Sequence, residues 1–175
     1  PIEVVYAKKT LGTGDTGFGL LLAAWNGGLL AGSLAYMRLG RRSPATLVLG
    51  STAAIGIAYA GLAAANTLWV ACLISIVGGI GNGFQWVSVM TLVQEATPLE
   101  LQARVVSLLE SLGAAMPGVG FLLGGTLTAV FSPRTAYAVA GIGTLLLVVV
   151  AALALPRGRP AEPLSAPSGM GRATD

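Results

Sequence analysis

The stretch SPATLVLGSTAAIGIAYAGLAAANTLWVACLISIVGGIGNGFQWVSVMTLVQ, residues 43 to 94, contains no Asp, Glu, Lys, Arg or His. A helix that crosses a bilayer needs about 20 mostly apolar residues, so a charge-free run of this length has room for two. The polar pair Asn66 and Thr67 follows three alanines near the middle of the run. The stretch therefore predicts two membrane helices, at about 45 to 65 and 68 to 93.

The rest of the chain repeats this pattern. A charge at the bilayer centre costs roughly 2.5 to 3.5 kcal/mol, so charge-free runs mark further spans. They predict helices at about 17 to 37, 106 to 131 and 135 to 155; the second of these includes Glu110 because a helical apolar pattern continues from Val105 to Leu112. Strands of a membrane β-barrel alternate apolar and polar residues over about ten positions, which these continuous runs do not do. The predicted fold class is an all-α integral membrane protein with five transmembrane helices.

The composition narrows the possible functions. Hydrophobic residues make up 54% of the chain and charged residues 10%, against about 25% charged in soluble domains. With one cysteine and no histidine, the chain cannot form an internal disulfide or a histidine-based metal site or catalytic triad. It has no basic stripe with interleaved aromatic residues. We therefore expect a protein of the lipid bilayer that is not an enzyme and has no cofactor, no metal and no nucleic-acid partner.

Arginine and lysine predict the orientation, because cytoplasmic loops carry an excess of both. One set of loops and the tail hold seven of these residues, while the other set holds Lys8, Lys9 and Arg134. The sequence thus predicts a multi-pass protein of the cell membrane with a cytoplasmic C-terminus. Residues 157 to 175 are rich in Pro, Ser and Gly and have no apolar period, so we expect a disordered cytoplasmic tail. Because the chain begins with Pro1 and not Met, we expect that a segment preceded it.

The third predicted span has two unlike faces. At 100° per residue, one arc holds the polar or small residues, and the opposite side, predicted to face lipid, holds Leu73, Ile76, Ile80, Phe84 and Val87. The polar arc contains Ser75, Gly78, Gly79, Asn82, Gln85 and Trp86. Two interpretations stay open. Asn82, Gln85 and Trp86 line a substrate cavity, or the amides join neighbouring helices while Gly79 and Gly83 form a GxxxG packing pair.

The fourth span carries a stripe of small residues with one carboxylate. Spacings of three and four place Glu110, Gly113, Pro117, Gly120 and Gly124 on one side of the helix, which predicts close packing there. Carboxylates inside membranes are rare and are candidates for function. Glu110 is therefore a candidate for ion coupling or for a salt bridge with a basic residue near the cytoplasmic gate; the alternative is a carboxylate that reaches interfacial water.

Three stretches resemble the C-terminal half of a major facilitator superfamily transporter, in particular the drug and siderophore exporters related to macrolide-efflux and enterobactin-export proteins. They are SLAYMRLGRRSP (33 to 44), GGIGNGFQWVSVMTLVQEATPLELQARVVSL (78 to 108) and GAAMPGVGFLLGG (113 to 125). The first resembles the family's cytoplasmic-loop motif at Arg38, Gly40, Arg41 and Arg42, with Met37 where that motif has Asp. The third resembles the antiporter glycine-proline motif.

The resemblance implies five helices of a six-helix half-bundle whose N-terminal partner half is missing from this chain. It also implies an ion- or proton-coupled exporter of an amphipathic small molecule, working by alternating access, with residues 38 to 42 as a gating loop. The competing expectation is a non-transporting helical membrane scaffold, or a nonfunctional remnant of a transporter.

Overall fold

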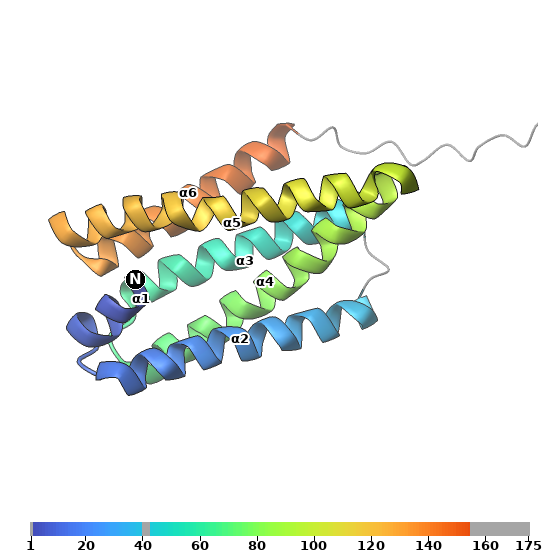
Figure 1. The fold of residues 1–175 in the computed structure, drawn as a ribbon. Helices are drawn as coiled ribbons and strands as arrows, with labels where there is room; N and C mark the ends of the chain where they lie inside the picture. The colour runs from blue at the N-terminus through green and yellow to red at the C-terminus, as the bar shows by residue number, and fades with distance from the viewer. Residues whose placement is uncertain (1, 40–42, 155–175) are drawn as a thin grey trace, which may run out of the picture.

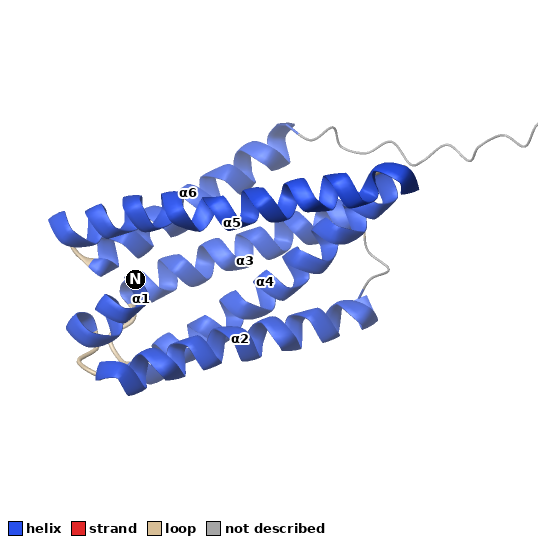
Figure 2. Cartoon of the chain, viewed as in Figure 1, coloured by secondary structure: helices blue, strands red, loops and turns tan. Residues whose placement is uncertain are grey.

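The computed structural model describes residues 2–39 and 43–154, and all of its regular elements are helices (Figures 1 and 2). Five of the helices are long and apolar enough to cross a membrane, so the all-helical membrane fold predicted from the sequence is confirmed. In chain order the elements are α1 (Ile2–Val5), the π-helical turn η1 (Tyr6–Thr10), α2 (Gly14–Leu39), α3 (Pro44–Ala64), α4 (Leu68–Ala96), α5 (Leu99–Val130) and α6 (Pro133–Ala154).

Local signals set the helix ends. The predicted break at Asn66 and Thr67 separates α3 from α4, and the Thr67 hydroxyl caps α4 by accepting a hydrogen bond from the backbone N–H of Val70. Proline occupies the first position of α3 and of α6, where its missing N–H costs no helical hydrogen bond. Two glycines with positive φ, Gly12 and Gly14, make the turn into α2.

Helix α5 begins at Leu99 rather than near residue 106, so most of the loop expected there is helical. Pro98 precedes the helix and Glu100 lies in its first turn, where a negative charge is favourable. The side chain of Gln102 donates hydrogen bonds to the backbone oxygens of Gln94 and Thr97, which ties the start of α5 to the end of α4. The helix then runs unbroken through Pro117.

The sequence predicts no helix in the first ten residues, yet Ile2–Thr10 is helical and enters the core. Tyr6 is fully buried, and its hydroxyl donates a hydrogen bond of 2.6 Å to the backbone oxygen of Leu62 at the end of α3. Its ring packs edge-on against Tyr137 of α6. Burial raises the pKa of the Tyr6 phenol, and the Arg134 charge acts in the opposite direction, so Tyr6 remains a neutral donor at physiological pH.

Glycines hold α2 and α4 in backbone contact. A Cβ built at Gly79 or Gly83 would collide with the backbone oxygen of Trp25 or Leu29 on α2. Conversely, a Cβ at Gly28 or Gly32 would collide with the backbone oxygen of Ile76 or Ile80 on α4. The GxxxG pair predicted on α4 therefore meets a second GxxxG pair on α2, the arrangement that lets membrane helices approach closely.

This contact corrects the expected lipid face of α4. The prediction that Ile76, Ile80 and Phe84 face lipid is wrong in part, because α2 packs on that side. The ring of Phe84 lies 6.2 Å from the ring of Tyr36 on α2, whereas Leu73 on the same side remains 65% exposed. Helical periodicity groups the residues of a face, but it does not say which neighbouring helix covers that face.

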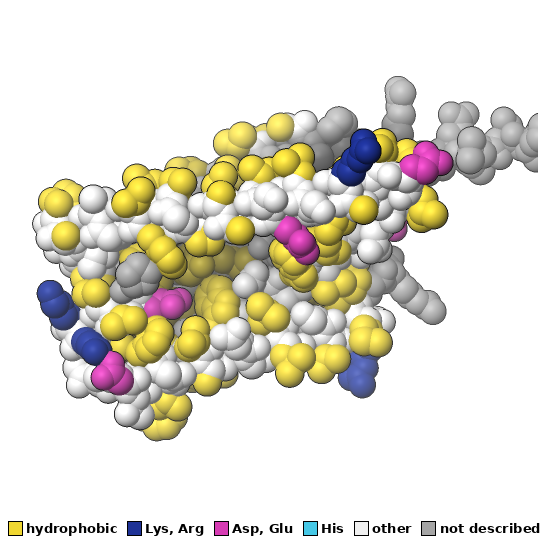
Figure 3. All heavy atoms as spheres, viewed as in Figure 1, with side chains coloured by type: hydrophobic (Ala, Val, Ile, Leu, Met, Phe, Trp, Pro, Cys, Tyr) yellow, Lys and Arg dark blue, Asp and Glu magenta, His cyan; other side chains and the backbone are white. Residues whose placement is uncertain are grey.

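Helix α5 is the least covered of the long helices. Helices α2, α4, α3 and α6 pack in that order along extensive interfaces, whereas α5 touches α4, α6 and α1 sparsely. It lies in front of α3 and α6 in Figure 1. The space-filling view shows a hollowed face between α5 and α2, with hydrophobic side chains on its floor and acidic side chains among them (Figure 3).

Candidate substrate path

Gln85, one of the three predicted cavity residues, is half-buried and joins two helices. Its side-chain amide donates a hydrogen bond of 2.7 Å to the hydroxyl of Thr52 on α3. The Thr52 hydroxyl in turn donates to the backbone oxygen of Val48. This geometry favours the interhelical-contact interpretation for Gln85 in the conformation described, and a role in binding substrate stays a prediction.

Asn82 and Trp86 lie on a different side of α4. They share a face with Ser75, being seven and eleven residues further along the helix. Ser75 borders a narrow hollow together with Glu3. Asn82 is half-buried and Trp86 is 55% exposed, so the face that carries them is open in the described part of the chain. Of the three predicted cavity residues, Trp86 is exposed, whereas Asn82 and Gln85 are both half-buried.

The predicted stripe on α5 is mostly uncovered. A Cβ at Gly113 or Gly120 would meet nothing within 4 Å, while one at Gly124 would collide with the side chain of Ile2. Pro117 and Glu110 are exposed as well. Close packing therefore occurs at Gly124, and for the rest of the stripe it stays a prediction that needs a partner beyond residues 2–39 and 43–154.

The predicted gating loop falls largely outside the described residues, which exclude Gly40, Arg41 and Arg42 as well as the predicted tail at 157 to 175. Arg38 is exposed in the last turn of α2. Successive long helices alternate in direction (Figure 1), so the end of α2 and the start of α5, where Arg104 lies, are at the same end of the bundle. This is the end predicted to be cytoplasmic.

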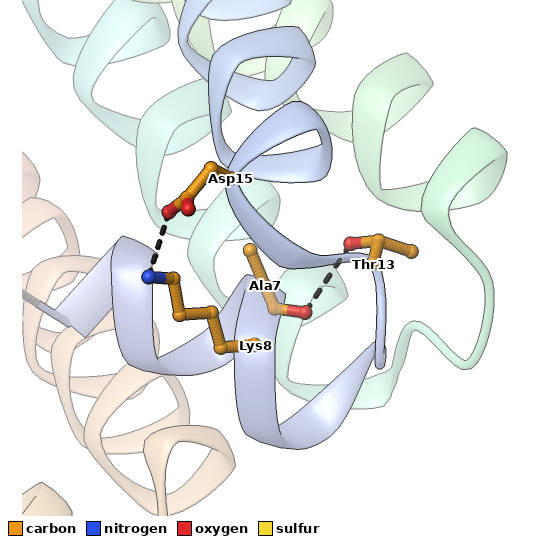
Figure 4. A network of polar contacts seen from close by, with 4 residues as sticks. All are labelled: Ala7, Lys8, Thr13 and Asp15. Atoms are coloured by element: carbon orange, nitrogen blue, oxygen red, sulfur yellow. Dashed lines mark hydrogen bonds and ion pairs between the residues drawn. The ribbon is translucent and has the colours of Figure 1, made fainter.

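At the opposite end of the bundle, Lys8 and Arg134 are fixed to neighbouring segments. Lys8 forms an ion pair of 2.7 Å with Asp15, next to a hydrogen bond from Thr13 to the backbone oxygen of Ala7 (Figure 4). Arg134 donates hydrogen bonds to the backbone oxygen of Ala65 and to the side-chain oxygen of Asn66. These contacts tie η1 to α2 and the start of α6 to the α3–α4 turn.

A cluster near Glu3 was not among the sequence-predicted site residues. Glu3 of α1 borders two adjoining hollows together with Tyr59 of α3 and Tyr137 of α6. Trp25 of α2 also borders the narrower hollow. An available signal was the short run IEVVY, in which an acid sits among apolar residues, but the run is too short to be recognised as a membrane span.

These features define a class, the polytopic helical membrane proteins, here with a hollowed face that carries carboxylate and aromatic side chains. The family follows from a scan against protein-family models, in which the Major Facilitator Superfamily model matches residues 1–174. The chain therefore belongs to the major facilitator superfamily, whose members are transporters rather than enzymes. Searches of curated proteins and of solved structures gave no match.

Proposed function

We propose that the chain is the C-terminal portion of an ion- or proton-coupled secondary transporter that exports an amphipathic small molecule by alternating access. The observation that carries the proposal is the uncovered, hollowed face between α5 and α2 (Figure 3). The stripe of α5 that includes Glu110 belongs to this face, because its member Gly120 borders the hollow beside Glu3 and its member Gly124 lies against Ile2.

The charge on this face argues against simple lipid exposure. Glu110 lies six residues beyond Arg104 on α5, or roughly 9 Å along the helix axis. Ionisable residues within membrane-spanning helices almost always face a bundle interior or a water-filled cavity rather than lipid. We therefore infer that this face looks toward the remaining helices of the transporter across a hydrated path, with Asn82 and Trp86 on its wall and Gln85 behind it.

The orientation belongs to the same proposal. With the Arg38 and Arg104 end in the cytoplasm, the C-terminus is cytoplasmic as well. A reporter protein fused after Asp175 should therefore be active only if it is a cytoplasmic type, such as a fluorescent protein that does not mature outside. Activity of an alkaline phosphatase fused at the same position would reverse the orientation and contradict the proposal.

Access of water to α4 tests the path directly. In the intact protein with Cys72→Ser, a Trp86→Cys thiol should react with a charged, water-soluble thiol reagent. The matched control is Ser88→Cys on the same helix, because Ser88 is fully buried and its thiol should stay unmodified. Reaction of Trp86→Cys only with a lipid-soluble maleimide would place Trp86 in the bilayer and remove this face from the path.

Transport itself separates a transporter from a scaffold. Cells that produce the intact protein should accumulate less of an amphipathic fluorescent dye than cells without it, and an uncoupler that collapses the ion gradients should abolish the difference. A scaffold would leave dye accumulation the same in both cell lines with and without the uncoupler.

A further inference from the structure

A small hollow lies between the first helical turns of the chain and the end of α5. It measures about 210 Å³ and is lined from both sides by Ile2, Val5, Lys9, Gly125, Thr128 and Ala129. Two adjacent glycines of α5 define its edge, because a Cβ at Gly124 would collide with Ile2 while a Cβ at Gly125 would meet nothing within 4 Å. The space over Gly125 is therefore open.

Lys9 gives this hollow a positive charge that is not neutralised within the described part of the chain. It lies in the last turn of η1, is exposed, and forms no ion pair with any residue that the structure describes. The neighbouring Lys8 differs, since it is paired with Asp15 (Figure 4). The acidic residue of the same segment, Glu3, borders two other hollows. Lys9 thus places an unpaired ammonium group beside an open space.

A second hydrogen-bond donor lines the same hollow. Thr91, Thr126 and Thr144 each donate their hydroxyl to the backbone oxygen four residues earlier in the helix. The hydroxyl of Thr128 has no such partner among the described residues, although it is shielded from solvent. A shielded polar group without a partner is unfavourable. Because threonine in a helix populates two side-chain rotamers, this hydroxyl can turn toward a ligand that accepts a hydrogen bond.

The surface next to the hollow is apolar and uncovered. The hollow lies at the end of the bundle, since Thr128 is two residues from the last residue of α5. Deeper along the helix, Leu122 is 74% exposed and a Cβ at Gly118 would meet nothing within 4 Å. Spacings of three and four residues align both with Gly125 on one face. A ligand with a charged head in the hollow can therefore lay an apolar chain along this face.

We propose that this hollow binds an anionic phospholipid whose headgroup carries a phosphate and no ammonium, of the phosphatidylglycerol kind. The phosphate accepts charge-assisted hydrogen bonds from Lys9 and a further bond from Thr128, and an acyl chain follows Gly125 and Leu122. A hollow of about 210 Å³ is smaller than pockets for whole small molecules, which begin at about 300 Å³. It suits a headgroup whose chains stay outside. This inference concerns a bound lipid and does not rest on the proposed transport function.

Binding of phosphatidylglycerol with a fluorescent acyl chain to the purified intact protein in detergent tests the site. Lys9→Gln should raise the Kd about tenfold, because it removes the charge-assisted hydrogen bond. The matched control is Lys8→Gln, which removes the same charge from the adjacent residue and should leave the Kd within about twofold in physiological salt. Gly125→Leu fills the hollow and should also weaken binding, whereas Gly113→Leu, at an equally open position of α5, should not.

Competition identifies the ligand. Phosphatidylethanolamine, whose ammonium group offsets its phosphate, should displace the probe less well than unlabelled phosphatidylglycerol, and millimolar inorganic phosphate should not displace it. Equal displacement by the two lipids, displacement by inorganic phosphate, or absence of binding by the parent protein would each overturn the inference.

The variants provide the remaining decision. Equal affinity of the parent protein and a folded Lys9→Gln protein would overturn the inference. If Lys9→Gln does not fold, the comparison of Gly125→Leu with Gly113→Leu replaces it, because both side chains enter open space and both variants keep the two donors. Equal affinity of these two variants would then overturn the site.

Discussion

Replacing either of two adjacent glycines on α2 by alanine should have opposite effects on the stability of the protein. A Cβ at Gly28 would collide with the backbone oxygen of Ile76, whereas a Cβ at Gly27 would meet nothing within 4 Å. Gly27→Ala should therefore leave the protein equally or slightly more stable, because alanine loses less conformational freedom than glycine in a helix, by roughly 0.5 to 1 kcal/mol. Gly28→Ala has the same conformational gain but must also separate two backbones.

The size of that second effect follows from what Gly28 touches. Overpacking a well-packed site costs typically about 1 to 3 kcal/mol. Here the obstacle is a backbone carbonyl, which cannot change rotamer, so α2 and α4 must move apart and the neighbouring contact of Gly32 with Ile80 opens too. Gly28→Ala should thus be less stable than Gly27→Ala by about 1 to 3 kcal/mol. For a chain of this size, this corresponds to a Tm difference of about 2 to 12 °C.

The single cysteine provides the assay. Cys72 is half-buried and lies seven residues before Gly79 on the same face of α4, so its thiol should become reactive when α2 leaves α4. A thiol-reactive fluorescent dye can follow this reaction during heating of the detergent-solubilised intact protein. Equal melting temperatures for Gly27→Ala and Gly28→Ala, or a higher one for Gly28→Ala, would refute the view that backbone contact between these helices is tight.

Three further substitutions test single contacts. Tyr6→Phe removes the donor of the 2.6 Å hydrogen bond to Leu62 and should lower the free energy of unfolding by about 1 kcal/mol, measured as a Tm loss of about 2 to 4 °C; an unchanged Tm would contradict it. Gln85→Ala and Thr52→Val should each lower the free energy of unfolding by only about 0.6 kcal/mol. If the hydrogen bond between the two side chains causes these losses, the double variant should lose no more than either single variant. Additive losses would show that the two side chains stabilise the protein independently. Glu110→Gln should leave the expression level unchanged but alter the pH dependence of transport, and an unchanged pH profile would favour a carboxylate that merely reaches interfacial water.

The five long helices could be predicted from the sequence because a charge inside a bilayer is so unfavourable that long runs with few or no charges mark the spans. The break at Asn66 and Thr67 was found for a similar reason, since polar residues that interrupt an apolar run mark a turn. Helix α5 starts earlier than predicted, because the prediction began at the apolar pattern from Val105. The first helical turns of α5 carry Glu100 and Arg104 on exposed positions, where the charges reach solvent at the end of the bundle.

The site was less predictable than the fold. Helical periodicity grouped Asn82, Gln85 and Trp86 on one arc, but the structure turns Gln85 toward Thr52 and leaves Trp86 open. An arc of that width can contact one helix at one edge and a cavity at the other. Glu3, in turn, lies on the short α1 segment, and only its position next to Tyr59 and Tyr137 in space gives it a possible role. No sequence spacing connects residues on three separate helices.

The glycines support the proposed path on the α5 side of the bundle. The sequence assigned one role, close packing, to the glycines of both α4 and α5. The structure divides them, because Gly79 and Gly83 press against the backbone of α2 while Gly113 and Gly120 face open space. The backbone contacts at Gly79 and Gly83 leave no room for a substrate between α2 and α4 at that level. The open face of α5 carries Glu110 and glycines, and small residues there leave space that a substrate or another helix can occupy.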